Sequence, residues 1–244
     1  MDKLHNVDYR EQIIVALDVA SKWQALELVD SFERQVHFVK VGMELYYGAG
    51  PVIVEELKKR GLKIFLDLKL HDIPNTVGKA SAQITRLGVD MYNLHIAGGL
   101  RMIESAREEM LKHLASGQKE PLLIGVTQLT STDETVLNHE IGIPLTVAES
   151  VVHYAKLAAR GGLAGVVSSV HEVNLIKEAC GKEFLTVTPG IRLANGNADD
   201  QKRIATPERA IEIGSDYLVI GRSITAAPDP AAVFNQIVEN LTAI

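Results

Sequence analysis

The sequence of 244 residues contains few features of a secreted or membrane protein. Its one cysteine, Cys180, excludes an internal disulfide. No run approaches the roughly 20 consecutive apolar residues that a membrane-spanning helix requires. The first residues, MDKLHNVDYREQ, are acidic and polar where a signal peptide has a basic patch followed by an apolar run. We therefore expect a cytoplasmic protein that contacts no membrane.

Basic side chains are outnumbered by acidic ones. The chain has 25 lysine and arginine residues against 31 aspartate and glutamate residues, a formal net charge of −6. Such a balance attracts no polyanion, and no local basic stripe is present, so we expect no nucleic-acid partner. Hydrophobic residues make up 46% of the chain, which excludes a disordered protein and predicts one with a sizeable core.

Short motifs of metal and dinucleotide sites are absent as well. The eight histidines form no H-x-H or H-E-x-x-H spacing, and Cys180 is isolated. The segment after the first expected strand reads DVASKW and lacks the G-x-G-x-x-G of dinucleotide-binding folds. We therefore expect no metal site, and an open doubly wound sheet is disfavoured.

The sequence does show a regular alternation of short β-branched runs with longer amphipathic segments. Eight strands are predicted, at residues 13–19, 36–42, 63–70, 91–96, 121–128, 165–169, 184–190 and 217–223. A helical pattern follows each strand, and left-handed glycine caps are expected at residues 61, 88, 161, 181 and 214. Eight strand-helix units in about 250 residues predict an α/β fold, a (β/α)8 TIM barrel in which residues 1–244 form a single domain.

Charged residues interrupt two of the apolar strands. Lys40 lies in HFVKVG, and Asp67 and Lys69 lie in IFLDLKL. Ionised groups are seldom buried without partners, so we expect these residues to pair at the barrel mouth. The strand period of two puts Asp67 and Lys69 on one side, and Asp72 in the next loop could join them. Opposite neighbours would keep the lysines as ammonium and the aspartates as carboxylate, so that one ammonium can donate a proton. A structural ion-pair network is the alternative interpretation.

Glycine and arginine residues follow the last two strands. The motif TPGIR occupies residues 188–192, and GRS occupies residues 221–223. Barrels commonly bind phosphate in the loops after strands seven and eight, where glycine admits backbone N–H groups and arginine supplies a forked charge. We therefore predict a phosphorylated substrate. The long segments 129–144 and 191–205 are expected to be binding loops at the same face.

The segment DLKLHDIPNT at residues 67–76 resembles the signature of the orotidine 5′-phosphate decarboxylase family. The resemblance covers the whole chain, with ALDV at 16–19, VKVG at 39–42, TQLTS at 127–131, TPGIR at 188–192 and VIGRSIT at 219–225. It implies decarboxylation of orotidine 5′-monophosphate to UMP, the last step of de novo pyrimidine synthesis. It also implies a homodimeric barrel with no metal or organic cofactor.

The resemblance assigns roles to particular residues. Lys69 would protonate C6 of the pyrimidine as carbon dioxide leaves, within a charged array of Lys40, Asp67, Lys69 and Asp72. Asp72 and Thr76 would act across the dimer interface, Thr76 on the ribose of the partner's substrate. Asp18 and Lys40 would hold ribose hydroxyls, and Thr130 would contact the pyrimidine amide edge. The further substrate-binding residues would be Pro189 and, at the phosphate, Arg192, Gln201, Gly221 and Arg222.

Two other interpretations remain. Magnesium-dependent sugar-phosphate decarboxylases and aldolases of the same superfamily share the Asp-x-Lys-x-x-Asp pattern. Their strand-two position carries a glutamate that helps to bind the metal, whereas Lys40 would repel a divalent cation. A non-catalytic phosphate-binding barrel is the second alternative. It would not need the charged array, whose burial costs desolvation.

Overall fold

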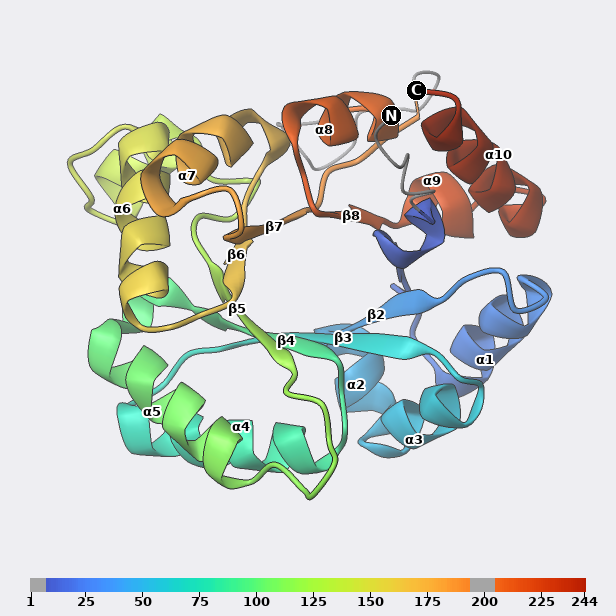
Figure 1. Ribbon diagram of the computed structural model, residues 1–244, viewed down its shortest axis with the longest axis horizontal. Helices are drawn as coiled ribbons and strands as arrows, with labels where there is room; N and C mark the ends of the chain where they lie inside the picture. The colour runs from blue at the N-terminus through green and yellow to red at the C-terminus, as the bar shows by residue number, and fades with distance from the viewer. Residues whose placement is uncertain (1–7, 194–204) are drawn as a thin grey trace, which may run out of the picture.

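The computed structural model describes residues 8–193 and 205–244. Eight parallel strands pair in sequence order and close into a barrel with helices around it (Figure 1). The strands are β1 Ile13–Ala16, β2 Phe38–Gly42, β3 Lys63–Leu70, β4 Met91–His95, β5 Leu122–Val126, β6 Gly165–Val167, β7 Leu185–Thr188 and β8 Tyr217–Ile220. The predicted (β/α)8 barrel is confirmed, whereas the extent of one domain over residues 1–244 stays a prediction.

Helices follow every strand of the described chain. They are α1 Lys22–Ser31, α2 Met43–Ala49, α3 Val52–Lys59, α4 Pro74–Arg86, α5 Leu100–Lys112, α6 Val147–Arg160, α7 Val173–Cys180, α8 Pro207–Ile213, α9 Arg222–Thr225 and α10 Pro230–Thr242. Short helical turns are η1 Tyr9–Glu11, η2 Ile96–Gly98, η3 Val136–Glu140 and η4 Val170–Glu172. Side-chain caps begin several helices. In α6, for example, Thr146 and Glu149 form a reciprocal capping box.

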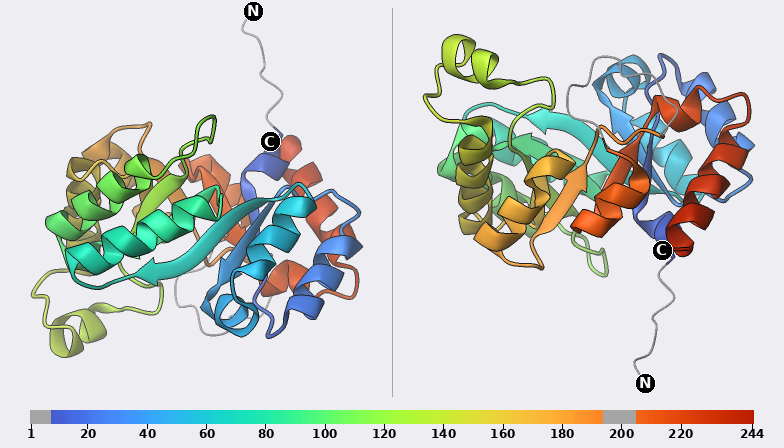
Figure 2. Two further views of the ribbon diagram at one scale, coloured as in Figure 1. Left: turned by 90° about the horizontal axis from the view of Figure 1, so that it is seen from below. Right: turned by 90° about the horizontal axis from the view of Figure 1, so that it is seen from above.

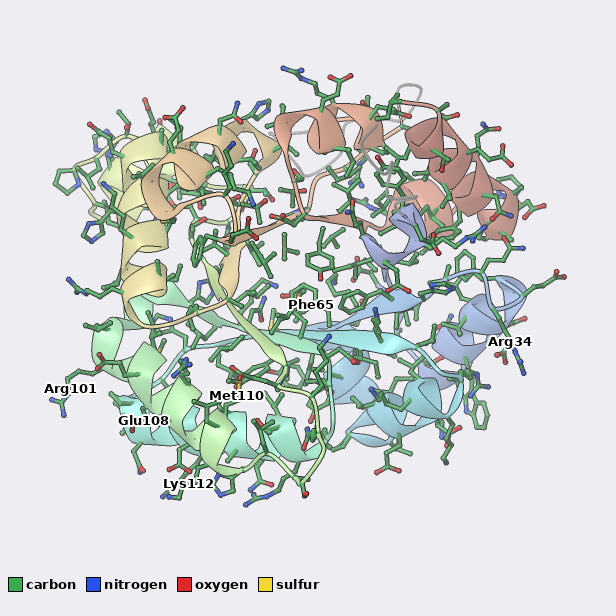
Figure 3. The ribbon with its side chains drawn as sticks, in the orientation of Figure 1. Arg34, Phe65, Arg101, Glu108, Met110 and Lys112 are labelled. Carbon is green, nitrogen blue, oxygen red and sulfur yellow. The ribbon has the colours of Figure 1, made fainter. Side chains whose placement is uncertain are left out.

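The barrel has two apolar layers because side chains of a strand alternate between its faces. A small cluster that includes Phe65 and Met91 fills the interior. A larger cluster lies between the strands and the helices. Figure 3 shows Phe65 within the ring of strands, while Arg101 and Lys112 point outward from α5. The inner face of α5 is apolar, as the helical pattern predicted after each strand requires, with Met110 buried.

Four of the five glycines predicted as left-handed caps have positive φ, at residues 61, 88, 181 and 214. Gly214 is a left-handed cap, whereas Gly181, with a ψ of 157°, adopts a different conformation. The expectation for Gly161 is wrong, because its φ is −78°, and the left-handed residue is Gly162 with φ of +77°. Adjacent glycines leave the position of a left-handed residue undecided in sequence, because either can adopt it without a Cβ clash.

A long segment connects β5 to α6 and carries η3. It projects away from the barrel in both views of Figure 2 and contains residues 129–144, the first of the two segments predicted as binding loops. The other predicted loop, residues 191–205, falls largely outside the described residues. Among residues 8–193 and 205–244, no helix is long and apolar enough to cross a membrane.

Candidate active site

The strand period of two places polar residues directly above the apolar interior. On four strands, an inner apolar residue is followed two positions later by a polar side chain at or near the carboxyl end of the strand. These pairs are Ala16 and Asp18, Phe38 and Lys40, Phe65 and Asp67, and Met91 and Asn93. The barrel interior thus ends in a polar floor at the mouth, the face where barrels perform chemistry.

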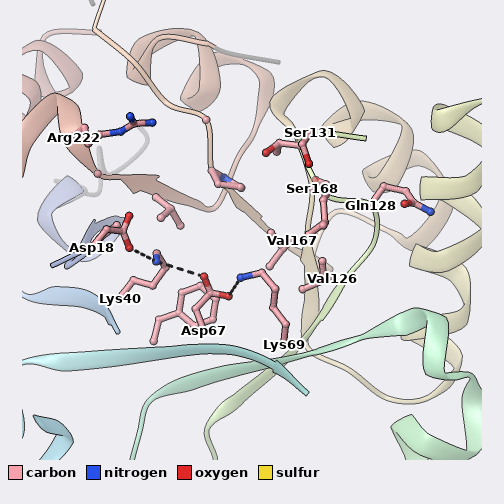
Figure 4. Close-up of a pocket in the computed structure, with 18 of the residues that line it drawn as sticks. Asp18, Lys40, Asp67, Lys69, Val126, Gln128, Ser131, Val167, Ser168 and Arg222 are labelled. Atoms are coloured by element: carbon pink, nitrogen blue, oxygen red, sulfur yellow. Dashed lines mark hydrogen bonds and ion pairs between the residues drawn. The ribbon is translucent and has the colours of Figure 1, made fainter. Parts of the chain in front are cut away.

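Four of the predicted residues form a continuous row of alternating charge (Figure 4). The Lys40 Nζ atom lies 2.9 Å from Asp18 Oδ1 and 3.5 Å from Asp67 Oδ2. The Lys69 Nζ atom lies 2.7 Å from Asp67 Oδ1. The Lys40 and Asp67 side chains are 11% and 13% exposed, whereas Asp18 is 54% exposed. The expected pairing of Lys40, Asp67 and Lys69 is confirmed, with Asp67 between the two lysines, and Asp18 extends the row beyond what was predicted.

The opposite charges in this row keep Lys40 and Asp67 ionised. Burial acts to lower the pKa of Lys40, but the charges of Asp67 and Asp18 outweigh it and leave this pKa raised. Burial likewise acts to raise the pKa of Asp67, but Lys40 and Lys69 outweigh it and leave this pKa lowered. Both groups are therefore charged at neutral pH, which agrees with the prediction for these two residues.

The backbone around Lys69 departs from regular strand geometry. The β3–β4 pairing joins Leu66 to Tyr92 and Leu70 to Leu94, so residues 67–69 of β3 lie opposite one β4 residue, Asn93. Lys69 has a φ of +52°, in the left-handed region that non-glycine residues seldom adopt. Such a bulge re-aims side chains. Asp67 and Lys69 therefore meet as predicted, but through a bulge and not through regular alternation alone.

A cavity of about 320 Å³ opens above the charged row. Its far side is formed by loops after β7 and β8, as predicted, with Pro189, Arg192, Gly221 and Arg222 in its wall. Figure 4 shows the Arg222 guanidinium extending toward this cavity. Gly190, also in the wall, has a φ of +81°, which a side chain would strain. Gln201 lies outside the described residues.

The third side of the cavity comes from β5 and β6. The predicted residue Thr130 lies in this wall, next to Ser131, and Val126 and Val167 make it partly apolar. Ser168 lines it too. The sequence reasoning missed these neighbours because short polar and apolar residues at strand ends carry no distinctive signal.

Two predicted residues are outside this cavity. Asp72 and Thr76 are exposed, in the loop after β3 and the first turn of α4. Asp72 Oδ1 accepts a hydrogen bond of 2.6 Å from the Ile73 N–H. Ile73, between them, is 66% exposed, which is unusual for a large apolar side chain. The row of charges within one chain therefore contains Asp18, Lys40, Asp67 and Lys69, and not Asp72.

Asn93 was also missed. It is buried on β4, donates from Nδ2 to Asp67 Oδ1 at 2.7 Å and accepts at Oδ1 from the Lys69 N–H at 2.8 Å. The available signal was its position in the apolar run MYNLH, two residues after an interior methionine. This signal is weaker than the one for Lys40 and Asp67, because an asparagine in an apolar run carries no charge.

Comparison with known proteins gives a consistent result. The model of the Orotidine 5′-phosphate decarboxylase / HUMPS family matches residues 11–237. An orotidine 5′-phosphate decarboxylase of Bacillus mycoides (strain KBAB4) is 52% identical over 227 residues, 93% of this chain and 95% of that protein. One from Halalkalibacterium halodurans is 53% identical over 222 residues, 91% of this chain and 94% of that protein.

A solved structure agrees in fold. The crystal structure of orotidine 5′-phosphate decarboxylase from Lactobacillus acidophilus has a TM-score of 0.84 and 41% identity, and the match covers 94% of this chain and 98% of that chain. Membership of the family follows from the family model and from relatives more than 50% identical in sequence, and not from the fold alone. The chain belongs to the orotidine 5′-phosphate decarboxylase / HUMPS family.

Proposed function

We propose that this protein decarboxylates orotidine 5′-monophosphate to UMP, the last step of de novo pyrimidine synthesis, with Lys69 as the proton donor. The observation that carries the proposal is the row of Asp18, Lys40, Asp67 and Lys69 at the floor of a cavity whose other end contains Arg192 and Arg222. A nucleoside monophosphate has matching ends, a polar base and ribose on one side and a phosphate on the other.

The chemistry needs a fixed positive charge beside the reacting carbon. When the bond between C6 and the carboxylate breaks, the electron pair stays on C6, where the ring delocalises it poorly. The Lys69 ammonium stabilises this developing charge without reorganisation and then transfers a proton to C6. The neutral amine regains a proton from solvent. Asp67 orients Lys69 through their 2.7 Å contact.

The remaining residues bind the rest of the substrate. Asp18 and Lys40 hold ribose hydroxyls, and Thr130 contacts the amide edge of the pyrimidine. At the other end, Pro189, Gly221 and the two arginines enclose the phosphate, together with Gln201. Binding energy from this remote phosphate contributes to ordering the site, so its loss affects turnover as well as affinity.

The site is completed by a second copy of the chain. In a homodimer, Asp72 would approach the partner's Lys69 and Thr76 would reach the partner's ribose. The support is that both are exposed beside the mouth and that the exposed Ile73 between them offers apolar surface for an interface. Asp72 would then extend the row of charges from the partner's side.

The side chains at the floor of the cavity favour a reaction without a metal. A divalent cation at Asp18 and Asp67 would lie against the Lys40 ammonium, which already contacts both carboxylates. We therefore propose no metal and no organic cofactor, in contrast to the magnesium-dependent relatives. A biosynthetic role on a free nucleotide also supports a cytoplasmic location.

The test is the loss of orotidine 5′-monophosphate absorbance with purified protein in excess EDTA. Wild type should turn over, and Lys69→Ala, which removes the proton donor, should not. Lys112→Ala is the matched control because this lysine is exposed on α5, away from the mouth. No turnover by folded wild type would reject the proposal and favour the metal-dependent or non-catalytic alternative.

A further inference from the structure

We propose that Asn93 is a positioning residue, whose side-chain amide holds Asp67 and the Lys69 backbone in the one arrangement that aims the Lys69 ammonium into the cavity. This inference rests on the proposed role of Lys69 as the proton donor. Asn93 lies beneath the cavity wall on β4 and is 1% exposed, so its contacts are made inside the protein.

The amide acts on the reactive lysine at two points, once through Asp67 and once directly at its backbone. Its Nδ2 donates to Asp67 Oδ1 at 2.7 Å, and this same oxygen accepts the 2.7 Å bond from Lys69 Nζ. Its Oδ1 accepts from the Lys69 backbone N–H at 2.8 Å. Asn93 therefore fixes both the start of the Lys69 side chain and the carboxylate that receives its end.

The bulge explains why a side chain is needed here. Residues 67–69 lie opposite Asn93 alone, so the regular ladder of backbone hydrogen bonds is interrupted where Lys69 adopts its φ of +52°. A partly buried N–H needs an acceptor. A left-handed conformation at a long side chain persists only where its surroundings hold it. The Asn93 oxygen supplies such an acceptor at this point.

Chemistry dictates the orientation of the amide. A carboxylate only accepts, so Nδ2 must face Asp67, and an N–H only donates, so Oδ1 must face Lys69. Few side chains of this size offer both functions at this separation. Aspartate keeps the acceptor but places a like charge against Asp67, and leucine has a similar shape with neither function.

The expected kinetic effect is on turnover. Without the amide, the bulge relaxes and the ammonium moves away from C6, while the arginines at the far end still hold the phosphate. Asn93→Leu should lower kcat on the order of 10²-fold, the effect expected of a misplacement near 1 Å, with KM changed less than about threefold. Thr186→Val is the matched control. It also loses a buried bond to a carboxylate, the 2.9 Å bond to Asp216, but at the amino end of the barrel.

Asn93→Asp gives a readout that a purely structural role would not produce. Burial and the neighbouring Asp67 should raise the pKa of the new carboxyl group. Once protonated, its hydroxyl can donate to Asp67 while its other oxygen accepts from Lys69, which restores both bonds. The ratio of variant to wild-type kcat should therefore rise as pH falls from about 8 to about 5.5.

Other ionisable groups face the same position, and dividing by the wild-type rate removes their common contribution. They are Lys40 from β2, Asp67 and Lys69 from β3, and His95 from β4 with His71 beside it, the two rings 5.6 Å apart. Burial, and to a smaller extent His71 and Lys69, lower the pKa of His95, while Asp67 acts in the opposite direction.

The experiment measures kcat and KM of wild type, Asn93→Leu, Asn93→Asp and Thr186→Val on orotidine 5′-monophosphate, with circular dichroism as the check on folding. A wild-type kcat in folded Asn93→Leu, or a pH-independent ratio for Asn93→Asp, would overturn the inference. If Asn93→Leu does not fold, Asn93→Asp at acid pH decides it.

A second readout separates this inference from the proposed function. Hydrogen exchange at the Lys69 amide needs no turnover and should be at least about tenfold faster in Asn93→Leu than in wild type. An inactive wild type that still shows this difference would reject the proposed function but leave the hydrogen-bonding arrangement intact. An active wild type with unchanged exchange and unchanged kcat in the variant would reject the role of Asn93 alone.

Discussion

Replacing Asp67 by asparagine should destabilise the fold, because this carboxylate lies between two ammonium groups at 2.7 and 3.5 Å. At an effective dielectric constant of about 20, each attraction is about 5–6 kcal/mol before desolvation. Desolvation offsets much of this, and breaking a buried pair from one side costs about 3–5 kcal/mol. For a chain of 244 residues, the melting temperature should fall by about 10 °C.

The destabilisation caused by Asp67→Asn should become smaller at both acid and alkaline pH. Burial opposes the charge of Asp67, but Lys40 and Lys69 leave its pKa lowered, so its contribution is present above the unfolded value of about 3.9 and lost as pH falls through the folded value. The pKa of Lys40 is raised despite burial, so its contribution is present below about 10.4 and lost as pH rises through the folded value. The difference between wild type and Asp67→Asn should be widest between about pH 5 and about pH 9.

Thermal unfolding followed by circular dichroism, at one protein concentration across this pH range, measures the effect. Asp18→Asn is the control, because its oxygen is only 2.9 Å from Lys40 but its side chain is 54% exposed. Water screens this pair, so its loss should cost at most about 1 kcal/mol. An Asp67→Asn effect no larger than that of Asp18→Asn, or one that is constant with pH, would refute the electrostatic argument.

Two further predictions concern the substrate and the dimer. Arg222→Ala should lower kcat/KM on the order of 10²-fold or more through loss of the phosphate contact, whereas Arg209→Ala, exposed on α8 and paired with Glu212, should leave the measured value unchanged. Mixing Lys69→Ala with Asp72→Ala protein should restore about a quarter of the wild-type activity if subunits exchange at random and share their sites. No recovery in a sample whose subunits demonstrably exchange would contradict the shared site.

The barrel and its charged row were predictable because each has a strong sequence signal. Alternating β-branched and amphipathic segments identify strands and helices, and Lys40 and Asp67 are conspicuous as charges inside apolar runs. Strand period then places both at the mouth. Six of the eight predicted strands extend beyond the observed carboxyl ends, as at β1, which ends at Ala16, because polar residues after a strand continue its pattern without its hydrogen bonds. The ends of β2 and β3 are as predicted.

The bulge and its partner were not predictable by the same reasoning. Periodicity assumes a regular ladder, and nothing in DLKL marks Lys69 as left-handed, since lysine has no preference for that conformation. Asn93 carries no charge, so it does not stand out as anomalous within a strand. Its importance depends on three β3 residues lying opposite it, a tertiary fact that local sequence does not contain.

The separation of the interior into an apolar layer and a polar layer above it affects how this fold can acquire new chemistry. Phe65 and Met91 pack the closed barrel, while Asp18, Lys40 and Asp67, each two positions after an interior residue of its strand, line the cavity. Mutations in the upper layer can therefore change which molecule is recognised without opening a void below. Because Asp67 and Lys40 stabilise each other, the changes most readily tolerated there are paired ones that keep the charges balanced. Directed evolution of this barrel should therefore select paired substitutions on neighbouring strands, in which one change of charge compensates the other.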